Sequence, residues 1–174
     1  PAVTTLGDTV HYTVQTLPVA LDTQVAVYDA ELAALDGGLG NYAGATLTLM
    51  RTGGANAQDL FSARGNLHFE GADAKLSGVT VGSVTNGGGT LAITFNANAT
   101  QARVNEVLSS LAYANASPTP PDHVQVQWSF SDGNGAGAAP QGLGDMPGQP
   151  LVASGFTDIA IRTNQGVQRQ MAEI

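Results

Sequence analysis

The sequence contains no cysteine, which excludes disulfide bonds, thiolate metal sites and cysteine nucleophiles. Basic residues are also few, since 6 Lys and Arg stand against 14 Asp and Glu and give a formal net charge of -8. Nucleic acids and anionic membrane surfaces are bound by clustered basic side chains, so we expect neither as a partner. No run of about 18 apolar residues occurs, and we therefore expect no membrane insertion.

A chain of 174 residues is long enough to bury one substantial hydrophobic core, and we expect no second domain. The first residues, Pro-Ala-Val, carry neither the charged region nor the apolar region of a secretion signal. We therefore expect the chain to be an excerpt from a longer polypeptide. Calcium often stabilises extracellular proteins that lack disulfides, and the acidic balance of this sequence suits a divalent cation.

Alternating apolar and polar residues mark many short strands. In the clearest segment, His123–Ser131, the residues Val124, Val126, Trp128 and Phe130 share one face, as in a half-buried antiparallel strand. Similar segments occur at residues 9–14, 24–28, 45–51, 66–70, 79–84, 90–95 and 156–161, and glycine-rich turns separate them. This pattern predicts an all-β fold, an antiparallel β-sandwich.

One segment has the period of a helix instead. Val104, Val107, Leu108 and Leu111 follow the i, i+3, i+4, i+7 spacing of an amphipathic helix. Asn98 is the predicted N-cap, with Gln101 three residues later. We therefore predict one short helix over about residues 99–111, connecting two strands of the sandwich.

Several segments taken in order resemble the cadherin-like repeats of large bacterial surface and secreted proteins, including adhesins of the RTX (repeats-in-toxin) type. The segments that carry the resemblance are residues 27–32, 41–55, 59–62, 90–96, 111–115 and 128–134. The resemblance implies a cadherin/immunoglobulin-like sandwich over residues 1–163, followed by a polar tail or linker at 164–174. It also implies a non-catalytic, extracellular, calcium-dependent extension module whose partners are neighbouring domains of the same long chain.

The same resemblance implies where calcium would bind. In cadherin-like modules a short acidic motif after an early strand holds Ca²⁺ at the junction with a neighbouring domain, and Asp29 and Glu31 occupy that place. Two carboxylates one residue apart on an extended segment point the same way, so we expect these two to share an ion. Asp132 and Asn134, in the turn after the Trp128 strand, form a second candidate oxygen cluster, although Asp-Gly-Asn-Gly is also ordinary turn chemistry. Arg162 stands where such repeats carry an acidic residue, so a second junction ion at the C-terminal side is not expected.

Catalysis has little support in the sequence. The three histidines, His11, His68 and His123, lack metal-ligand spacing, and no G-x-S-x-G nucleophile motif occurs, so we expect no enzymatic activity. An alternative function stays open, because the long Gly/Pro-rich stretch at residues 133–150 is of the kind that often carries function. In that case the chain is a carbohydrate- or peptide-binding module, with a cell-surface or glycan ligand at this loop.

Overall fold

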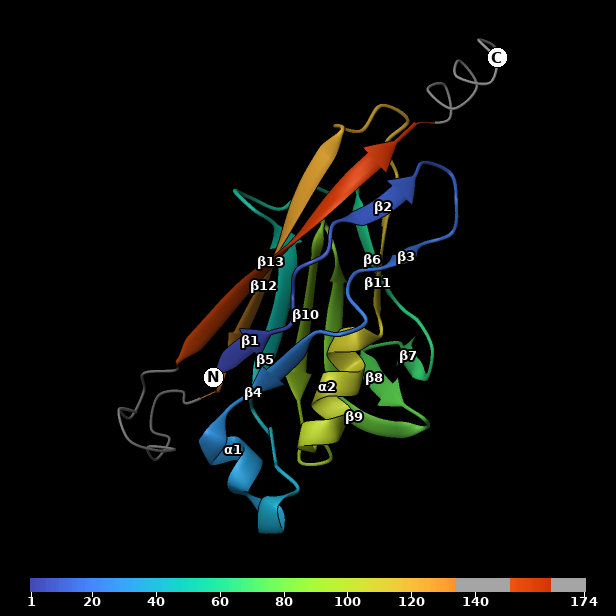
Figure 1. The fold of residues 1–174 in the computed structure, drawn as a ribbon. Coiled ribbons are helices and arrows are strands. Elements are labelled where there is room, and N and C mark those ends of the chain that lie inside the picture. The colour runs from blue at the N-terminus through green and yellow to red at the C-terminus, as the bar shows by residue number, and fades with distance from the viewer. Residues whose placement is uncertain (134–150, 164–174) are drawn as a thin grey trace.

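The computed structural model describes residues 1–133 and 151–163, and an eight-stranded main sheet forms its larger layer (Figure 1). The strand order across this sheet is β2-β13-β12-β5-β10-β9-β8-β7. The strands are β2 (Val10–Thr13), β13 (Val152–Arg162), β12 (His123–Ser131), β5 (Thr46–Arg51), β10 (Thr90–Phe95), β9 (Val79–Gly87), β8 (Asp73–Leu76) and β7 (Leu67–Glu70).

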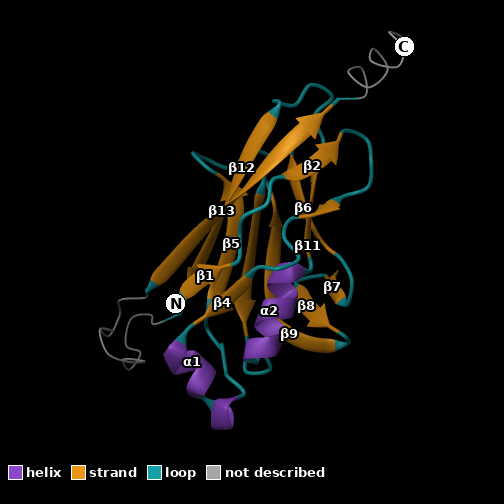
Figure 2. Ribbon diagram, viewed as in Figure 1, coloured by secondary structure: helices purple, strands orange, loops and turns teal. Residues whose placement is uncertain are grey.

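Smaller elements cover the inner face of the main sheet (Figure 2). A three-stranded minor sheet has the order β3-β11-β6, and β1 pairs with β4 in a two-stranded ribbon. Their bounds are β3 (Val19–Ala20), β11 (Leu111–Asn115), β6 (Asp59–Ala63), β1 (Ala2–Thr4) and β4 (Ala26–Tyr28). The helices are α1 (Ala30–Ala34), the 3-10 helix η1 (Asp36–Gly38) and α2 (Gln101–Ser109). Among the described residues, every helix is too short or too polar to cross a membrane.

The core lies between these layers, and strand β12 supplies its largest side chains. Val124, Val126, Trp128 and Phe130 are all buried, as the alternation in the sequence predicts. The Trp128 indole N–H donates a hydrogen bond to Thr157 Oγ1 at 2.8 Å, so its one polar group is satisfied inside the core. The prediction of an all-β sandwich with a short helix is confirmed, since 49 % of the described residues lie in strands and α2 is the only described helix of seven or more residues.

One strand pair departs from the antiparallel prediction. Strand β2 pairs with β13 in parallel, with Val10 opposite Ile159 and Thr13 opposite Arg162. Earlier in the chain, Leu6 lies against the backbone of β13, where a Cβ added at Gly155 would meet its side chain. The first residues of the chain therefore follow β13 in the same direction along its length.

Helix α2 connects β10 of the main sheet to β11 of the minor sheet. Three residues of the predicted apolar face, Val104, Val107 and Leu108, are buried on the helix. The prediction is wrong for the fourth, Leu111, because the helix ends at Ser109 and Leu111 begins β11. The predicted N-cap, Asn98, is wrong: Thr100 caps the helix and its side chain accepts a hydrogen bond from Arg103 N. Asn98 instead donates from its side-chain amide to Thr80 O at 3.0 Å, which fixes the approach to the helix to strand β9.

Candidate functional site

Asp29 and Glu31 do not lie on an extended segment as predicted. Asp29 is the N-cap of α1, and its Oδ1 accepts hydrogen bonds from Glu31 N and Leu32 N, each at 3.1 Å. The carboxylate is 3 % exposed, whereas Glu31 stands in the first turn of the helix and is half-buried. The geometry that the prediction needs, two carboxylates pointing the same way from a strand, is therefore absent at these residues.

Asp132, the second predicted position, is fully buried where β12 ends. Its backbone N donates to Leu151 O at 3.0 Å, and its Oδ1 accepts from Leu151 N at 3.1 Å. The side chain thus ties the end of β12 to the residue that precedes β13. Asn134, its predicted partner, lies outside the described residues.

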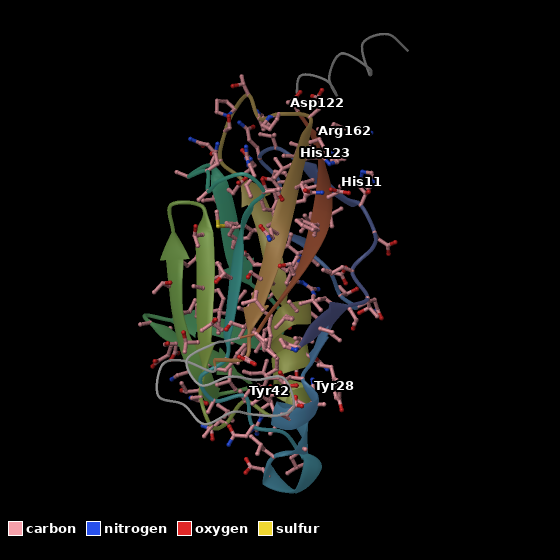
Figure 3. All side chains as sticks on the ribbon, turned by 90° about the vertical axis from the view of Figure 1, so that its left-hand side faces the viewer. His11, Tyr28, Tyr42, Asp122, His123 and Arg162 are labelled. Carbon is pink, nitrogen blue, oxygen red and sulfur yellow. The ribbon has the colours of Figure 1, made fainter. Side chains whose placement is uncertain are left out.

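The fold brings the two predicted acidic positions to the same end of the sandwich. The Tyr42 hydroxyl oxygen accepts a hydrogen bond from Asp29 N at 3.2 Å, and the Tyr42 ring meets the Phe130 ring at 6.0 Å between centroids. Phe130 lies two residues before Asp132 on β12. We call this end of the molecule the Asp29 end; Figure 3 shows Tyr42 there, close to α1.

Calcium prefers about six to eight oxygen ligands. Asp29 Oδ1 and Asp132 Oδ1 already accept backbone hydrogen bonds. Over residues 1–133 and 151–163, the structure holds no group of three or more His, Asp or Glu side chains placed for a metal. The described residues by themselves do not supply a calcium cage, so the calcium site stays a prediction.

A buried polar network at the Asp29 end joins helix α2 to the ribbon. The Tyr42 hydroxyl donates to Gln101 Oε1, and Gln101 Nε2 donates to Val27 O at 2.7 Å. On the same strand, Val27 N donates to Asn105 Oδ1 at 3.0 Å. Burial raises the pKa of Tyr42, which keeps its hydroxyl protonated as a donor. Two amide side chains of α2 thus occupy the outer hydrogen-bonding edge of β4.

A second buried network, which we call the Asp59 network, joins the main sheet to the minor sheet. Arg51 on β5 donates from Nε to Asp59 Oδ2 at 2.9 Å and from Nη2 to Asp59 Oδ1 at 2.8 Å. Tyr113 on β11 donates from its hydroxyl to Asp59 Oδ1 at 2.5 Å, and Asn115 Nδ2 donates to the same oxygen at 3.3 Å. The Asp59 carboxylate on β6 is thus surrounded by donors from two other strands, β5 and β11.

The protonation states of this network are fixed by burial and by the ion pair. Burial, together with the hydrogen bond to Asp59, raises the pKa of Tyr113, so the phenol remains a neutral donor. The hydrogen bonds that Arg51 donates to Asp59 raise the pKa of Arg51. This network cannot be recognised in the sequence, because its members are separated along the chain and none belongs to a catalytic or metal-binding motif.

At the opposite end of the main sheet, which we call the Arg162 end, several polar side chains gather. Figure 3 shows His11, Asp122, His123 and Arg162 together at this end. A hollow of about 510 Å³ is lined by His11, Tyr12, Thr13, Ala160, Ile161 and Arg162. It exists because the small Ala160 stands between His11 and His123, which are its register partners on the two neighbouring strands.

At the Arg162 end, His123 forms an exposed pair with Asp158 of the neighbouring strand β13. His123 Nε2 lies 3.5 Å from Asp158 Oδ1, and this carboxylate also accepts from Gln125 Nε2 at 3.1 Å. More than half of the His123 side chain is exposed to solvent. This solvent-exposed pair places a hydrogen-bond donor and an acceptor side by side at the Arg162 end.

The outer face of the main sheet is the largest surface that the fold leaves uncovered by other described elements. Its central strands present mainly hydroxyl side chains, because the alternate residues of each strand point away from the core. The sequence pattern predicts this orientation for Thr46 and Thr48, and both are half-buried by their neighbours on the sheet. It does not predict which strands lie side by side, and the pairing therefore determines the chemistry of this face.

No family model, curated protein or solved structure matches this chain. The resemblance to cadherin-like repeats therefore stays a prediction, and function has to be argued from the fold and from the surfaces described above.

Proposed function

We propose that this chain is a non-catalytic structural module of a large extracellular adhesin-type protein, arranged end to end with neighbouring domains. The observation that supports this function most directly is the path of the chain. The ribbon strand β1 starts at the Asp29 end, where Ala2 pairs with Tyr28, and β13 ends at Arg162 beside Thr13. The chain therefore passes through the module from one end to the other (Figure 1).

This path suits a module that transmits tension. A strand rises about 3.3 Å per residue, so the 11 residues of β13 span about 35 Å along the long direction of the sandwich. When the two ends of the chain are pulled apart, β2 and its parallel partner β13 are drawn in opposite directions along their length. Their hydrogen bonds are then loaded together, in shear, and the Asp59 network holds the minor sheet to the main sheet meanwhile.

A force measurement tests this role. The chain has no cysteine, so two introduced thiols can serve as the only attachment points. Pulling the A2C/R162C variant loads β2 and β13 in shear, whereas pulling the T16C/R162C variant opens the same strand pair from one end, bond by bond. We expect a severalfold higher rupture force for the first variant, because forced unfolding follows the barrier to strand separation. Equal forces would rule out the mechanical role.

As part of this function, we propose that calcium binds at the Asp29 end. The structure supports it only in that Asp29, Glu31 and Asp132 lie towards one end, where a neighbouring domain could complete the set of ligands. If the single module binds the ion, its folded state gains about 2.7 kcal/mol at a free concentration 100 times the Kd, and the thermal midpoint rises. The measurement is the midpoint with calcium and with EGTA.

The matched control for the calcium experiment is the E31Q variant, which removes one charge at an accessible position. Its midpoint is expected to rise less than that of the unchanged protein when calcium is added. If the unchanged protein has the same thermal unfolding midpoint in calcium and in EGTA, the single module does not bind calcium. The force prediction would not be affected by that result.

A further inference from the structure

The outer face of the main sheet carries hydroxyl groups in continuous rows that cross the strands. In the first row, Ser83, Thr94, Thr46 and Ser131 are successive register partners on β9, β10, β5 and β12. In the second row, the register partners are Thr85, Ala92, Thr48, Ser129 and Ser154, which extends the row to β13. Residues opposite each other on paired strands point to the same face, so these side chains form one surface, which we call the hydroxyl face.

The hydroxyl face is free of charge. The next row, formed by Gly87, Thr90, Met50, Gln127 and Phe156, adds an amide and apolar groups but no ionisable side chain. Charged residues lie at the margins of the face: Asp73 on β8 is the register partner of Ser83 and ends the first row, and Asp158 on β13 lies beyond the third row. Solvent-exposed protein surface normally mixes Lys, Arg, Glu and Asp at about 25–35 %. Only 11 % of this chain is charged, and none of its charged side chains occupies a position of these three rows on β9, β10, β5, β12 or β13.

The hydroxyl groups of this face are available to a ligand. Within the described part of the chain, Ser131 Oγ accepts a hydrogen bond from Gly133 N at 3.3 Å, and the other hydroxyls of the two rows form no side-chain hydrogen bond with the protein. Each hydroxyl offers one donor and two acceptors. Because neighbouring strands are about 4.8 Å apart, each row presents these groups at nearly regular intervals.

We infer that the hydroxyl face binds a neutral polysaccharide, which lies across the strands along the rows. Sugar hydroxyls are donors and acceptors at once and match side chains of the same kind. The spacing of the strands is close to the length of one pyranose residue, so successive sugars meet equivalent groups. Phe156, 47 % exposed at the margin of the face, and Met50 offer apolar contact to the C–H surface of a sugar ring.

The absence of charge on the hydroxyl face favours a neutral polysaccharide over an anionic one. An anionic polysaccharide would find no basic side chain on the face and would meet a protein of the same overall sign. A second copy of the chain would bring hydroxyl rows against hydroxyl rows, without the apolar centre that stable protein interfaces have. A neutral polymer requires neither an opposite charge nor a large apolar area.

Retention on insoluble polysaccharides tests the inference. We expect the protein to bind at least one of three neutral polymers, microcrystalline cellulose, curdlan and mannan, and not calcium-free alginate beads. The T48K variant places an ammonium group in the middle of the second row, and S154K places one at its exposed end. Each should weaken binding roughly tenfold or more, because the charge would lose water without gaining a partner.

The T119K variant is the matched control, since it adds the same charge at an exposed threonine of the loop between β11 and β12, and it should bind as the unchanged protein does. Circular dichroism checks the fold of each variant, and the S154K variant alone decides the test if T48K fails to fold.

The inference is overturned by no retention on any neutral polymer, by equal retention on alginate, or by unchanged binding of S154K. A concentration-dependent dimer that S154K abolishes, with no retention, would assign the face to a second copy instead. This inference rests on the proposed adhesive role but not on the force prediction, so either can fail alone.

Discussion

Replacement of Asp59 by alanine is expected to destabilise the folded protein by about 3–5 kcal/mol, because it leaves a buried guanidinium without its counter-ion. The Asp59 side chain is 0 % exposed and that of Arg51 is 21 % exposed. In the variant, water can therefore solvate the unpaired Arg51 guanidinium only in part. The same replacement removes the acceptor of the Tyr113 hydroxyl and of Asn115 Nδ2. Urea unfolding followed by the fluorescence of Trp128, the single tryptophan, measures the loss.

Two comparison variants define what this result means. The D59N variant keeps the size of the side chain but not its charge, and we expect it to lose less stability than D59A. The E70Q variant removes the other short carboxylate bridge, Lys75–Glu70 at 2.6 Å, where the Glu70 side chain is 65 % exposed. Its unfolding midpoint should stay near that of the unchanged protein, because solvent screens such pairs. A D59A loss no greater than that of E70Q would show that the Asp59 network does not hold the sheets together.

Replacement of Gly89 by alanine should cost about 3–5 kcal/mol, from backbone strain and a steric clash combined. Gly89 has φ +86, and a Cβ added there would lie 2.5 Å from the carbonyl carbon of Asn56 and 2.7 Å from its nitrogen. Those atoms belong to a neighbouring backbone segment that is itself fixed by the hydrogen bond from Asp59 N to Asn56 O. Neither side of the contact can move aside without disturbing the turn that carries Asp59.

The adjacent glycine supplies the control. Gly88 also has a positive φ, +64, but a Cβ added there would meet no atom within 4 Å. The G88A variant should therefore lose only the cost of the left-handed conformation, about 1–2 kcal/mol. Thermal unfolding of both variants separates the two contributions. Equal losses for G88A and G89A would mean that the contact with Asn56 has no energetic weight.

The sequence predicts the main sheet better than the smaller layer, for a physical reason. Strand β12 has one buried and one outer face, so its residues alternate and the pattern identifies both the strand and its core side. Strand β11 is buried at Leu111, Ala112 and Tyr113 in succession, which leaves no alternation to detect. Helix α1 does have a local signal, since Asp29 precedes a run of good helix formers, but an acidic pair beside a strand invited the calcium interpretation instead.

The two candidate surfaces depend on contacts between distant parts of the chain. Asp59 accepts hydrogen bonds from a residue 8 positions before it and from residues 54 and 56 positions after it. No local sequence pattern indicates contacts between residues so far apart. The outward orientation of Thr48 follows from alternation on β5 alone. That it lies between Ala92 and Ser129 follows only from the order of the strands, which the sequence does not reveal. Position within a strand was therefore predictable, while the composition of a face was not.

The amide side chains that occupy strand edges have a consequence for a chain of many similar domains. Gln101 and Asn105 satisfy both backbone groups of Val27 on β4, and Asn86 Nδ2 donates to Phe61 O on β6 at 2.7 Å. Open edges recruit strands from other molecules, and tethering in one polypeptide raises the effective concentration of such strands greatly. In the proposed array of domains, these side chains would leave adjacent copies little opportunity to exchange strands at β4 and β6 while a stretched domain refolds.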